Sequence, residues 1–417
     1  MTTSAPVARR RLPTPSLEAW ADRSAGRLAE AIARRARPGT RSGDLTRRAL
    51  RWPWHTLIAW ALFSLFLLDA ANAEATRGYP AAFLALLAIP AGALLLRRPV
   101  WLGVVMAIAG TYLRVLYLSY PETCDQLAVS RAALTLVAHG TSPWGFGYAE
   151  SVPPGAPFPY GPLGALASVL GVPGEVLAMG AILLLLAWSR ALITGAFLAA
   201  WVSWIELGIC GINDQLPALL LLGGLLLLER RRLAGAVLVG VSVGIKPYAF
   251  AWVPPLIGFG GPMVTVVLLG VTALCWAPML LLRPNGWEGS AAVEPVLEVT
   301  PQASGGPEPV TVIRSYLESV EMARGIHPRP ENTLDMPALR VLAVPIAIAA
   351  LWVRSWSTAV LTGALIFLVV LFLDRWASFG YWLVVLPPVG IVLERALDGL
   401  GRRLRAALAE TVPVPAA

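Results

Sequence analysis

Apolar residues occupy long, uninterrupted runs along most of this chain, and polar residues gather in a few stretches between them. The first three runs lie at residues 52–72, 80–96 and 99–119. A helix needs about 20 mostly apolar residues to cross the hydrocarbon core of a bilayer. Continuous runs are typical of membrane helices, whereas a membrane β-barrel alternates apolar and polar positions. The pattern therefore predicts an all-α polytopic membrane protein.

Further apolar runs continue towards the C-terminus and raise the expected number of membrane-crossing segments to about 11–12. The run at residues 160–189 is either one long span, broken near Val172, Pro173 and Gly174, or two short half-spans. We therefore expect short paired or broken helices beside straight ones. The remaining runs lie at residues 191–209, 216–228, 233–259, 262–282, 339–353, 355–373 and 376–394.

Arginines mark the turns between alternate runs. They occur in the N-terminal arm, at residues 97–98 and 230–232, at Arg354 and near the C-terminus. Cytoplasmic loops of membrane proteins carry an excess of Lys and Arg. Both termini are therefore expected on the cytoplasmic side of the plasma (inner) membrane. The loops at residues 120–159 and 283–338 are then expected outside.

The run at residues 233–259 is unusual because Lys246 and Pro247 lie at its middle. As a single span, it would put the later arginine clusters on the wrong side. A hairpin of two short helices that turns at Lys246-Pro247 restores the expected order. Irregular backbone and a charged side chain are tolerated at membrane depth where they line a cavity open to water. We therefore expect the hairpin.

These expectations divide the chain into five parts. Within the second external loop, a helix is predicted at about residues 309–324, because Pro stands near its start and Gly follows its end. That loop either covers an active site, binds an acceptor or is a solvated cap. A basic helix on the membrane surface is predicted within residues 16–37. The parts are a basic cytoplasmic tail at 1–51, a membrane core at 52–282, an external loop at 283–338, C-terminal membrane helices at 339–395 and a basic cytoplasmic tail at 396–417.

Composition supports this class and narrows the function. Of the 417 residues, 57% are hydrophobic and 14% are charged, whereas soluble domains carry about 25% charged residues. The net charge of +8 comes from arginines that orient the chain and attract anionic membrane lipids, so no nucleic-acid partner is expected. The three cysteines and three histidines are scattered and show no disulfide or metal-ligand spacing. No nucleotide-binding loop occurs, so a soluble sugar-nucleotide or ATP site is not expected. If the protein transfers a group on the external side, the donor should be lipid-borne.

A polar island rich in Pro and Gly interrupts the apolar pattern at residues 120–163. A loop of this length is usually functional or disordered, and its aromatic residues argue against disorder. Asp125 suits a general base that deprotonates an acceptor hydroxyl just outside the membrane. Its alternative role is the N-cap of a helix at residues 126–139. Arg131 and His139 on that helix are candidates for orienting anionic groups.

A second polar group is predicted at membrane depth. Asn213 and Asp214 precede the apolar run at residues 216–228, and Lys246 lies in the predicted hairpin. Charged residues at this depth cost free energy and are by default candidates for a functional site. Lys246 suits the neutralisation of a phosphate, while Asn213 and Asp214 contact a sugar or orient the lysine. The alternatives are a helix cap at Asp214, or an Asp214–Lys246 ion pair that only joins helices.

Aromatic residues form a collar in the polar island. Interfacial aromatic belts need no ligand, but aromatic rings also pack on the apolar faces of sugars, and both interpretations stay open. Trp144, Tyr148 and Tyr160 are the substrate-binding candidates. The whole collar consists of Trp144, Phe146, Tyr148, Phe158 and Tyr160.

The order and spacing of these motifs resemble the C-type (GT-C fold) integral-membrane glycosyltransferases, most closely the bacterial polyprenyl-phosphate-mannose-dependent mannosyltransferases. The similarity covers roughly residues 100–260. That family carries an external Asp, a Pro-containing turn, a P-Y-G-P-L re-entry, a Gly-x-Asn-Asp motif, an arginine turn and a lysine. The corresponding residues here are Asp125; Ser142, Pro143 and Trp144; residues 159–163; Gly211, Asn213 and Asp214; residues 230–232; and Lys246. Ile212 and Trp144 depart from the pattern, where the family often has His or Gln and Tyr.

The resemblance implies inverting transfer of mannose, another hexose or a pentose from a polyprenyl-phosphate donor to an envelope glycan, lipid or protein on the external face. Asp125 would be the catalytic base and Lys246 a contact of the donor phosphate. Ligand counting implies no essential metal cofactor, although Asp125 and Asp214 are able to share a divalent metal ion. The alternative class is a transporter or lipid flippase with its substrate site around Asp214 and Lys246. A third is a non-catalytic member that scaffolds an envelope complex.

Overall fold

Nearly all of the described chain is helical. The computed structural model describes residues 52–73, 80–118, 125–145, 147–151, 154–201, 205, 213–282, 309–326, 337–373 and 379–410, with single residues between 23 and 34. Within these ranges the only strands form one short antiparallel hairpin, in which β1 (Gly147–Tyr148) pairs with β2 (Ala156–Pro157). The predicted all-α class is confirmed. Most of the predicted surface helix, Phe146, Gly211 and Ile212 lie outside the described residues.

The helices follow the predicted apolar runs closely. Among the described residues, four helical stretches are long and apolar enough to cross a membrane: Trp54–Asn72, Pro99–Tyr117, Pro162–Ser189 and Pro247–Leu281. They support a membrane protein. The bounds are Trp54–Ala73 (α3), Pro80–Leu94 (α4), Pro99–Tyr117 (α5), Gln126–Ala138 (α6), Pro162–Ala167 (α7), Ser168–Leu170 (η1), Gly171–Ser189 (α8), Leu192–Ala200 (α9), Gln215–Leu228 (α11), Arg232–Ile245 (α12), Pro247–Trp252 (η2), Val253–Trp276 (α13), Ala277–Leu281 (η3), Pro309–Ile326 (α14), Pro337–Leu342 (η4), Ala343–Ala350 (α15), Trp356–Phe372 (α16), Phe379–Tyr381 (η5) and Trp382–Glu410 (α17).

The paths of two helices bear on the predicted break at residues 172–174 and the predicted C-terminal tail. The run at residues 160–189 does break, at Gly171, one residue before the predicted position. Gly171 has φ +57°, a left-handed conformation that glycine adopts without steric cost. The last helix, α17, begins at Trp382 and continues to Glu410, so helix extends well into the segment predicted as a basic tail.

The predicted turn at Lys246-Pro247 is confirmed. α12 ends at Ile245, and Lys246 is extended, with φ −134° and ψ 114°. Pro247 cannot donate the backbone hydrogen bond that would continue α12, and it starts η2 instead. The chain therefore leaves α12 at the lysine and reverses.

A second reversal follows at Gly261, which has φ +77° inside α13. The Arg232 guanidinium lies 5.6 Å from the Phe259 ring centroid, so the returning segment reaches the start of α12. A Cβ added at Gly244 would lie 2.8 Å from Cys275 Cβ, so the second half of α13 runs out again beside the end of α12. The chain thus passes three times between the two ends of α12.

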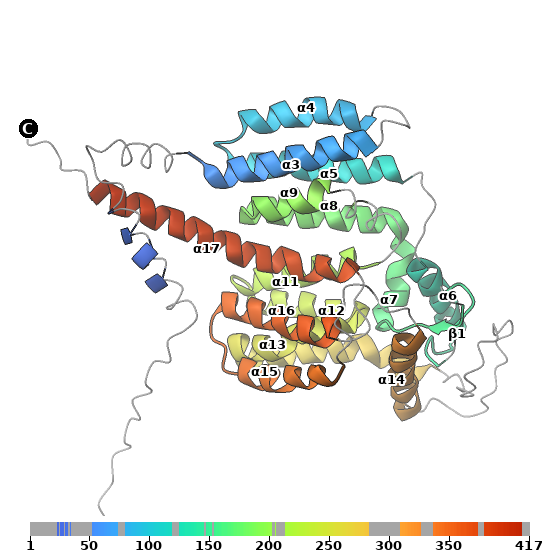
Figure 1. The fold of residues 1–417 in the computed structure, drawn as a ribbon. Coiled ribbons are helices and arrows are strands. Elements are labelled where there is room, and N and C mark those ends of the chain that lie inside the picture. Colours follow the sequence, from blue (N-terminus) through green and yellow to red (C-terminus); the bar gives the residue numbers. More distant parts are fainter. Residues whose placement is uncertain are drawn as a thin grey trace, which may run out of the picture. The chain divides into compact units, whose positions relative to one another are not determined.

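The helices of the unit Pro53–Arg395 lie side by side in a stack, and the basic turns meet at one end of it (Figure 1). Arg395 Nη1 donates to Glu229 Oε1 at 2.7 Å, which joins α17 to the turn after α11. Arg354 Nη1 donates to the Gly258 carbonyl at 2.5 Å, near the second reversal of α13. These contacts bring together turns that the sequence predicts on one side.

A buried carboxylate fixes the same end. Glu394 accepts hydrogen bonds from the backbone N–H groups of Ile193 and Thr194, at 2.9 and 2.8 Å, where α9 begins. Its Oε2 also lies 2.5 Å from His55 Nε2. A carboxylate at a helix N-terminus satisfies donors that have no partner within the helix. Glu394 thereby joins α17, α9 and α3.

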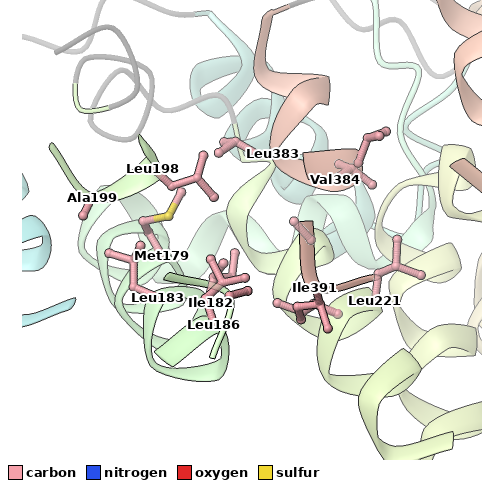
Figure 2. Packing of buried hydrophobic residues seen from close by; sticks show 14 of the residues in the cluster. Met179, Ile182, Leu183, Leu186, Leu198, Ala199, Leu221, Leu383, Val384 and Ile391 are labelled. Carbon is pink, nitrogen blue, oxygen red and sulfur yellow. The ribbon is translucent and has the colours of Figure 1, made fainter. Parts of the chain in front are cut away.

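The apolar core lies between these helices, away from their ends. Figure 2 shows α8 side chains facing those of α9, α11 and α17. Close packing of this kind makes the core sensitive to added volume. The labelled members are Met179, Ile182, Leu183, Leu186, Leu198, Ala199, Leu221, Leu383, Val384 and Ile391.

Gly110 allows α5 and α9 to approach closely, so we expect Gly110→Ala to destabilise the protein. An added Cβ would lie 2.8 Å from the Ala199 carbonyl oxygen, and overpacking of this kind costs about 1–3 kcal/mol. The matched control is Gly270→Ala, because nothing lies within 4 Å of its Cβ position. Thermal unfolding in detergent should show a lower midpoint for Gly110→Ala and an unchanged or higher one for Gly270→Ala. Equal midpoints would contradict this packing.

Candidate functional site

Short elements of the polar island at residues 120–163 form a cap at the end of the stack away from the basic turns (Figure 1). The predicted helix of the second external loop is confirmed as α14, and it packs on this cap. The Gly145 N–H donates to Ser319 Oγ at 3.0 Å, which ties the loop to α14. The buried apolar side chains of the cap are Val129, Ala133, Trp144, Tyr148, Phe158, Ala165, Met279 and Val312.

Trp144 and Tyr148 hold the loop in shape. The Trp144 ring stacks on Trp276 with centroids 5.2 Å apart, and its Nε1 donates to the Tyr160 carbonyl at 3.0 Å. The Tyr148 hydroxyl donates to the Pro143 carbonyl at 2.7 Å. Burial, with a smaller effect of nearby Glu150, raises the pKa of Tyr148 well above its ordinary value, so the phenol stays a donor. Direct contact of either ring with a substrate stays a prediction.

The predicted ion pair between Asp214 and Lys246 is present beneath the cap. Lys246 Nζ lies 2.5 Å from Asp214 Oδ1, and the two side chains are only 3% and 2% exposed. The Tyr248 hydroxyl donates to the same oxygen at 2.9 Å. Asp214 makes no side-chain bond to the start of its own helix. Its carboxylate therefore serves the lysine and not helix capping.

Tyr160 connects this pair to the cap. Its ring centroid lies 4.5 Å from Lys246 Nζ, a cation–π distance. The next residue, Gly161, donates its N–H to the Ile245 carbonyl at 3.0 Å. A Cβ at Gly161 would lie 2.4 Å from the Gly244 carbonyl oxygen, so only glycine allows this approach.

Asp125 lies within electrostatic reach of Tyr160. The Tyr160 phenol lies within electrostatic range of Tyr381, Asp214 and Asp125. Asp125 occupies the N-cap position of α6 but makes no side-chain capping bond. The structure thus brings Asp125, Tyr160 and the Asp214–Lys246 pair into one region.

Asn213 lies in the same region. It has φ +47°, a conformation that Asn tolerates better than most residues. Its Nδ2 donates to Ser130 Oγ at 3.0 Å, which connects the start of α11 to α6. Asn213 is therefore held between the cap and the ion pair, and its contact with a sugar stays a prediction.

Arg131 and His139 are not brought to this cluster. His139 is exposed at the end of α6, and its Nδ1 lies 2.7 Å from the Thr135 carbonyl. The 13 residues of α6 place it about 20 Å from Asp125. Arg131 is exposed, and its Nη2 lies 3.4 Å from the Cβ position of Gly171 at the break before α8. Their proposed contacts with anionic groups stay predictions.

Besides Glu394, two further buried charged residues of the described stack did not enter the predicted site. Glu175 Oε2 accepts the backbone N–H of Gln215 at 2.8 Å and anchors the start of α11. Arg114 is fully buried, and its guanidinium donates to the Leu198 and Ala199 carbonyls at the end of α9. Each is a lone charged residue inside an apolar run, which is the sequence signal that marks such positions.

No family model matches the sequence, and no curated protein or solved structure matches it either. Within the described ranges, no group of three His, Cys, Asp or Glu side chains is placed to hold a metal ion. The side chains themselves are therefore the evidence for function. They offer a carboxylate at the cap, a buried ammonium group below it, and phenols and amides between them.

Replacing only Lys246 of the Asp214–Lys246 pair should lower the stability of the protein more than replacing both residues. Lys246→Met leaves Asp214 as an uncompensated buried charge, which costs about 3–5 kcal/mol, whereas replacing both partners by apolar residues is often neutral. We expect a large loss of thermal stability for Lys246→Met and recovery of most of it in the Lys246→Met/Asp214→Leu double variant.

The control for this comparison is the exposed Arg314–Glu318 pair on α14. Pairs of this kind contribute about 0–1 kcal/mol, so Glu318→Gln should change the unfolding midpoint little. If the double variant were as unstable as the sum of its single variants, the two side chains would not be coupled as described.

Proposed function

We propose that this protein is a multi-pass membrane glycosyltransferase with GT-C-like architecture. It transfers mannose, another hexose or a pentose from a polyprenyl-phosphate donor to an envelope glycan, lipid or protein. One observation supports the proposal: the Tyr160 ring lies 4.5 Å from the Lys246 ammonium group, and Asp125, the candidate base, lies within electrostatic range of the same side chain. A base and a phosphate-binding cation are the two charged groups that this reaction needs.

The distribution of charge supports the proposed orientation. The turns that carry Arg354 and Arg395 lie at one end of the stack, and the cap lies at the other (Figure 1). The positive-inside rule assigns the basic end to the cytoplasm. The cap and Asp125 then face outward, and both termini are cytoplasmic. The number of crossings, about 11–12, follows the predicted runs.

In the proposed reaction, the donor phosphate lies against Lys246 and the acceptor hydroxyl lies against Asp125. The Asp125 carboxylate takes the hydroxyl proton while the hydroxyl oxygen attacks the anomeric carbon. The bond from that carbon to the phosphate oxygen breaks, and its electron pair leaves on polyprenyl phosphate. The additional negative charge of the leaving phosphate is stabilised by the lysine, which exchanges Asp214 for it. Attack opposite the leaving group inverts the anomeric configuration.

A transporter or flippase is the alternative, because buried charges also mark transport sites. Transporter sites usually lie near the membrane midplane, between broken helices. Lys246 instead follows the last residue of α12, on the side of the cap, where the re-entry segment at Gly161 contacts it. This position favours an enzyme that works at the external surface of the plasma membrane.

We expect Asp125→Asn to lower the initial rate of sugar transfer about 100-fold or more, since a lost general base typically costs 10²–10⁴ in rate. Purified protein in nanodiscs is incubated with radiolabelled polyprenyl-phosphate mannose and a membrane-lipid extract, and labelled product is counted. The control is Glu150→Gln, which removes an exposed acid from the same loop and should keep the wild-type rate. Near-normal transfer by Asp125→Asn would remove Asp125 as the base.

A further inference from the structure

Several buried amide groups near the ion pair have no hydrogen-bond partner among the described residues. They are both amide atoms of Gln215, Oδ1 of Asn213 and Oε1 of Gln126. The Gln215 residue is 0% exposed and Asn213 is 5% exposed. Buried polar atoms are nearly always hydrogen-bonded, so each exception needs an explanation.

These amides lie in one neighbourhood. Ser130 Oγ accepts from Asn213 Nδ2 at 3.0 Å and donates to the backbone carbonyl of Gln126 at 2.6 Å, so Asn213 lies beside the first turn of α6, which carries Gln126. Gln215 follows two residues after Asn213. Its backbone N–H donates to Glu175, so the start of α11 is already capped without the Gln215 side chain. The side-chain amide of Gln215 therefore serves no capping role.

The unpartnered atoms define the ligand chemistry. Three of them are carbonyl oxygens, which only accept hydrogen bonds, and one is an amide nitrogen, which only donates. Hydroxyl groups both donate and accept, so a ring carrying several hydroxyls matches the set. A carboxylate offers no donor, and it would also meet the negative charge of Asp214.

The position of the ion pair indicates that this ring is the sugar of the donor. Asp214 stands between Asn213 and Gln215 in the chain, and its carboxylate lies 2.5 Å from Lys246 Nζ. A sugar joined to a phosphate at Lys246 would fall beside these amides. We propose that Asn213, Gln215 and Gln126 form the subsite for the donor sugar, and that they select a neutral hydroxyl-bearing ring over an acidic sugar. This inference rests on the proposed function.

The test compares binding of three lipids to the protein in nanodiscs: bare polyprenyl phosphate, polyprenyl-phosphate mannose and polyprenyl-phosphate glucuronic acid. Two hydrogen bonds to neutral groups correspond to about a tenfold change in affinity. Wild type should therefore bind the mannose lipid about tenfold more tightly than the bare lipid, and the glucuronic acid lipid no more tightly than the bare one. Gln215→Leu should lose the mannose preference and keep the affinity for bare lipid.

Thermal unfolding without lipid provides a second readout. Gln215→Leu removes an unpartnered buried amide at similar volume, so its unfolding midpoint should be equal to or higher than that of wild type. The control is Ser242→Ala, which removes a buried hydroxyl that donates to the Pro217 carbonyl of α11 at 2.8 Å. This variant should keep the mannose preference, and its midpoint should be lower.

The outcomes separate the two proposals. Binding of bare and mannose lipids with equal affinity would overturn the sugar subsite and leave the phosphate site standing. A mannose preference that survives in Gln215→Leu, or a lower midpoint for that variant, would also overturn the subsite. Failure of all three lipids to bind would overturn the proposed function itself, and the subsite with it.

Discussion

A lysine charge buried among apolar helices has to be neutralised, and much of this structure follows from how that is done. Lys246 Nζ and Asp214 Oδ1 lie 2.5 Å apart, and a pair at this depth is tolerated only with good geometry and further hydrogen bonds. Tyr248 supplies one such bond to Asp214. Pro247 ends α12 after Ile245, and the extended Lys246 at this turn reaches Asp214 at the start of α11. The re-entry segment lies beside the same turn, because the Gly161 N–H donates to the Ile245 carbonyl.

The cap is a separate construction that relies on aromatic packing and not on charge. Trp144 is fully buried between Trp276 and Tyr316, with ring centroids 5.2 and 5.3 Å away. Its indole N–H holds the Tyr160 carbonyl. Because Tyr160 also lies over Lys246, the aromatic cluster fixes how the outer loop sits on the buried pair. A rigid support of this kind is what a base needs to act on a substrate held by another segment.

The elements were predictable because their signals are local. Apolar runs, a Pro after Lys246 and arginines at the turns each act within a few residues. The Asp214–Lys246 pair, 32 residues apart in the chain, was one of the alternatives that the sequence offered, because charged residues within apolar runs are costly unless they are paired. The roles of Glu175 and Gln215 were not predictable, because each depends on a neighbour that lies 40 residues away in the chain. The burial of Trp144 was not predictable either, because Trp276 and Tyr316 lie far from it in the sequence. His139 was placed near the site from its helix alone, but the length of α6 carries it away.

We propose that Lys246 receives the phosphate of a lipid-borne sugar beneath Asp125. The most direct measurement is a cryo-electron microscopy structure of the protein in nanodiscs with polyprenyl-phosphate mannose and the Asp125→Asn change, which should prevent turnover. The donor phosphate should lie within about 3 Å of Lys246 Nζ, and the anomeric carbon should lie between that phosphate and residue 125. A headgroup bound elsewhere, with the Lys246–Asp214 pair intact, would contradict this proposal.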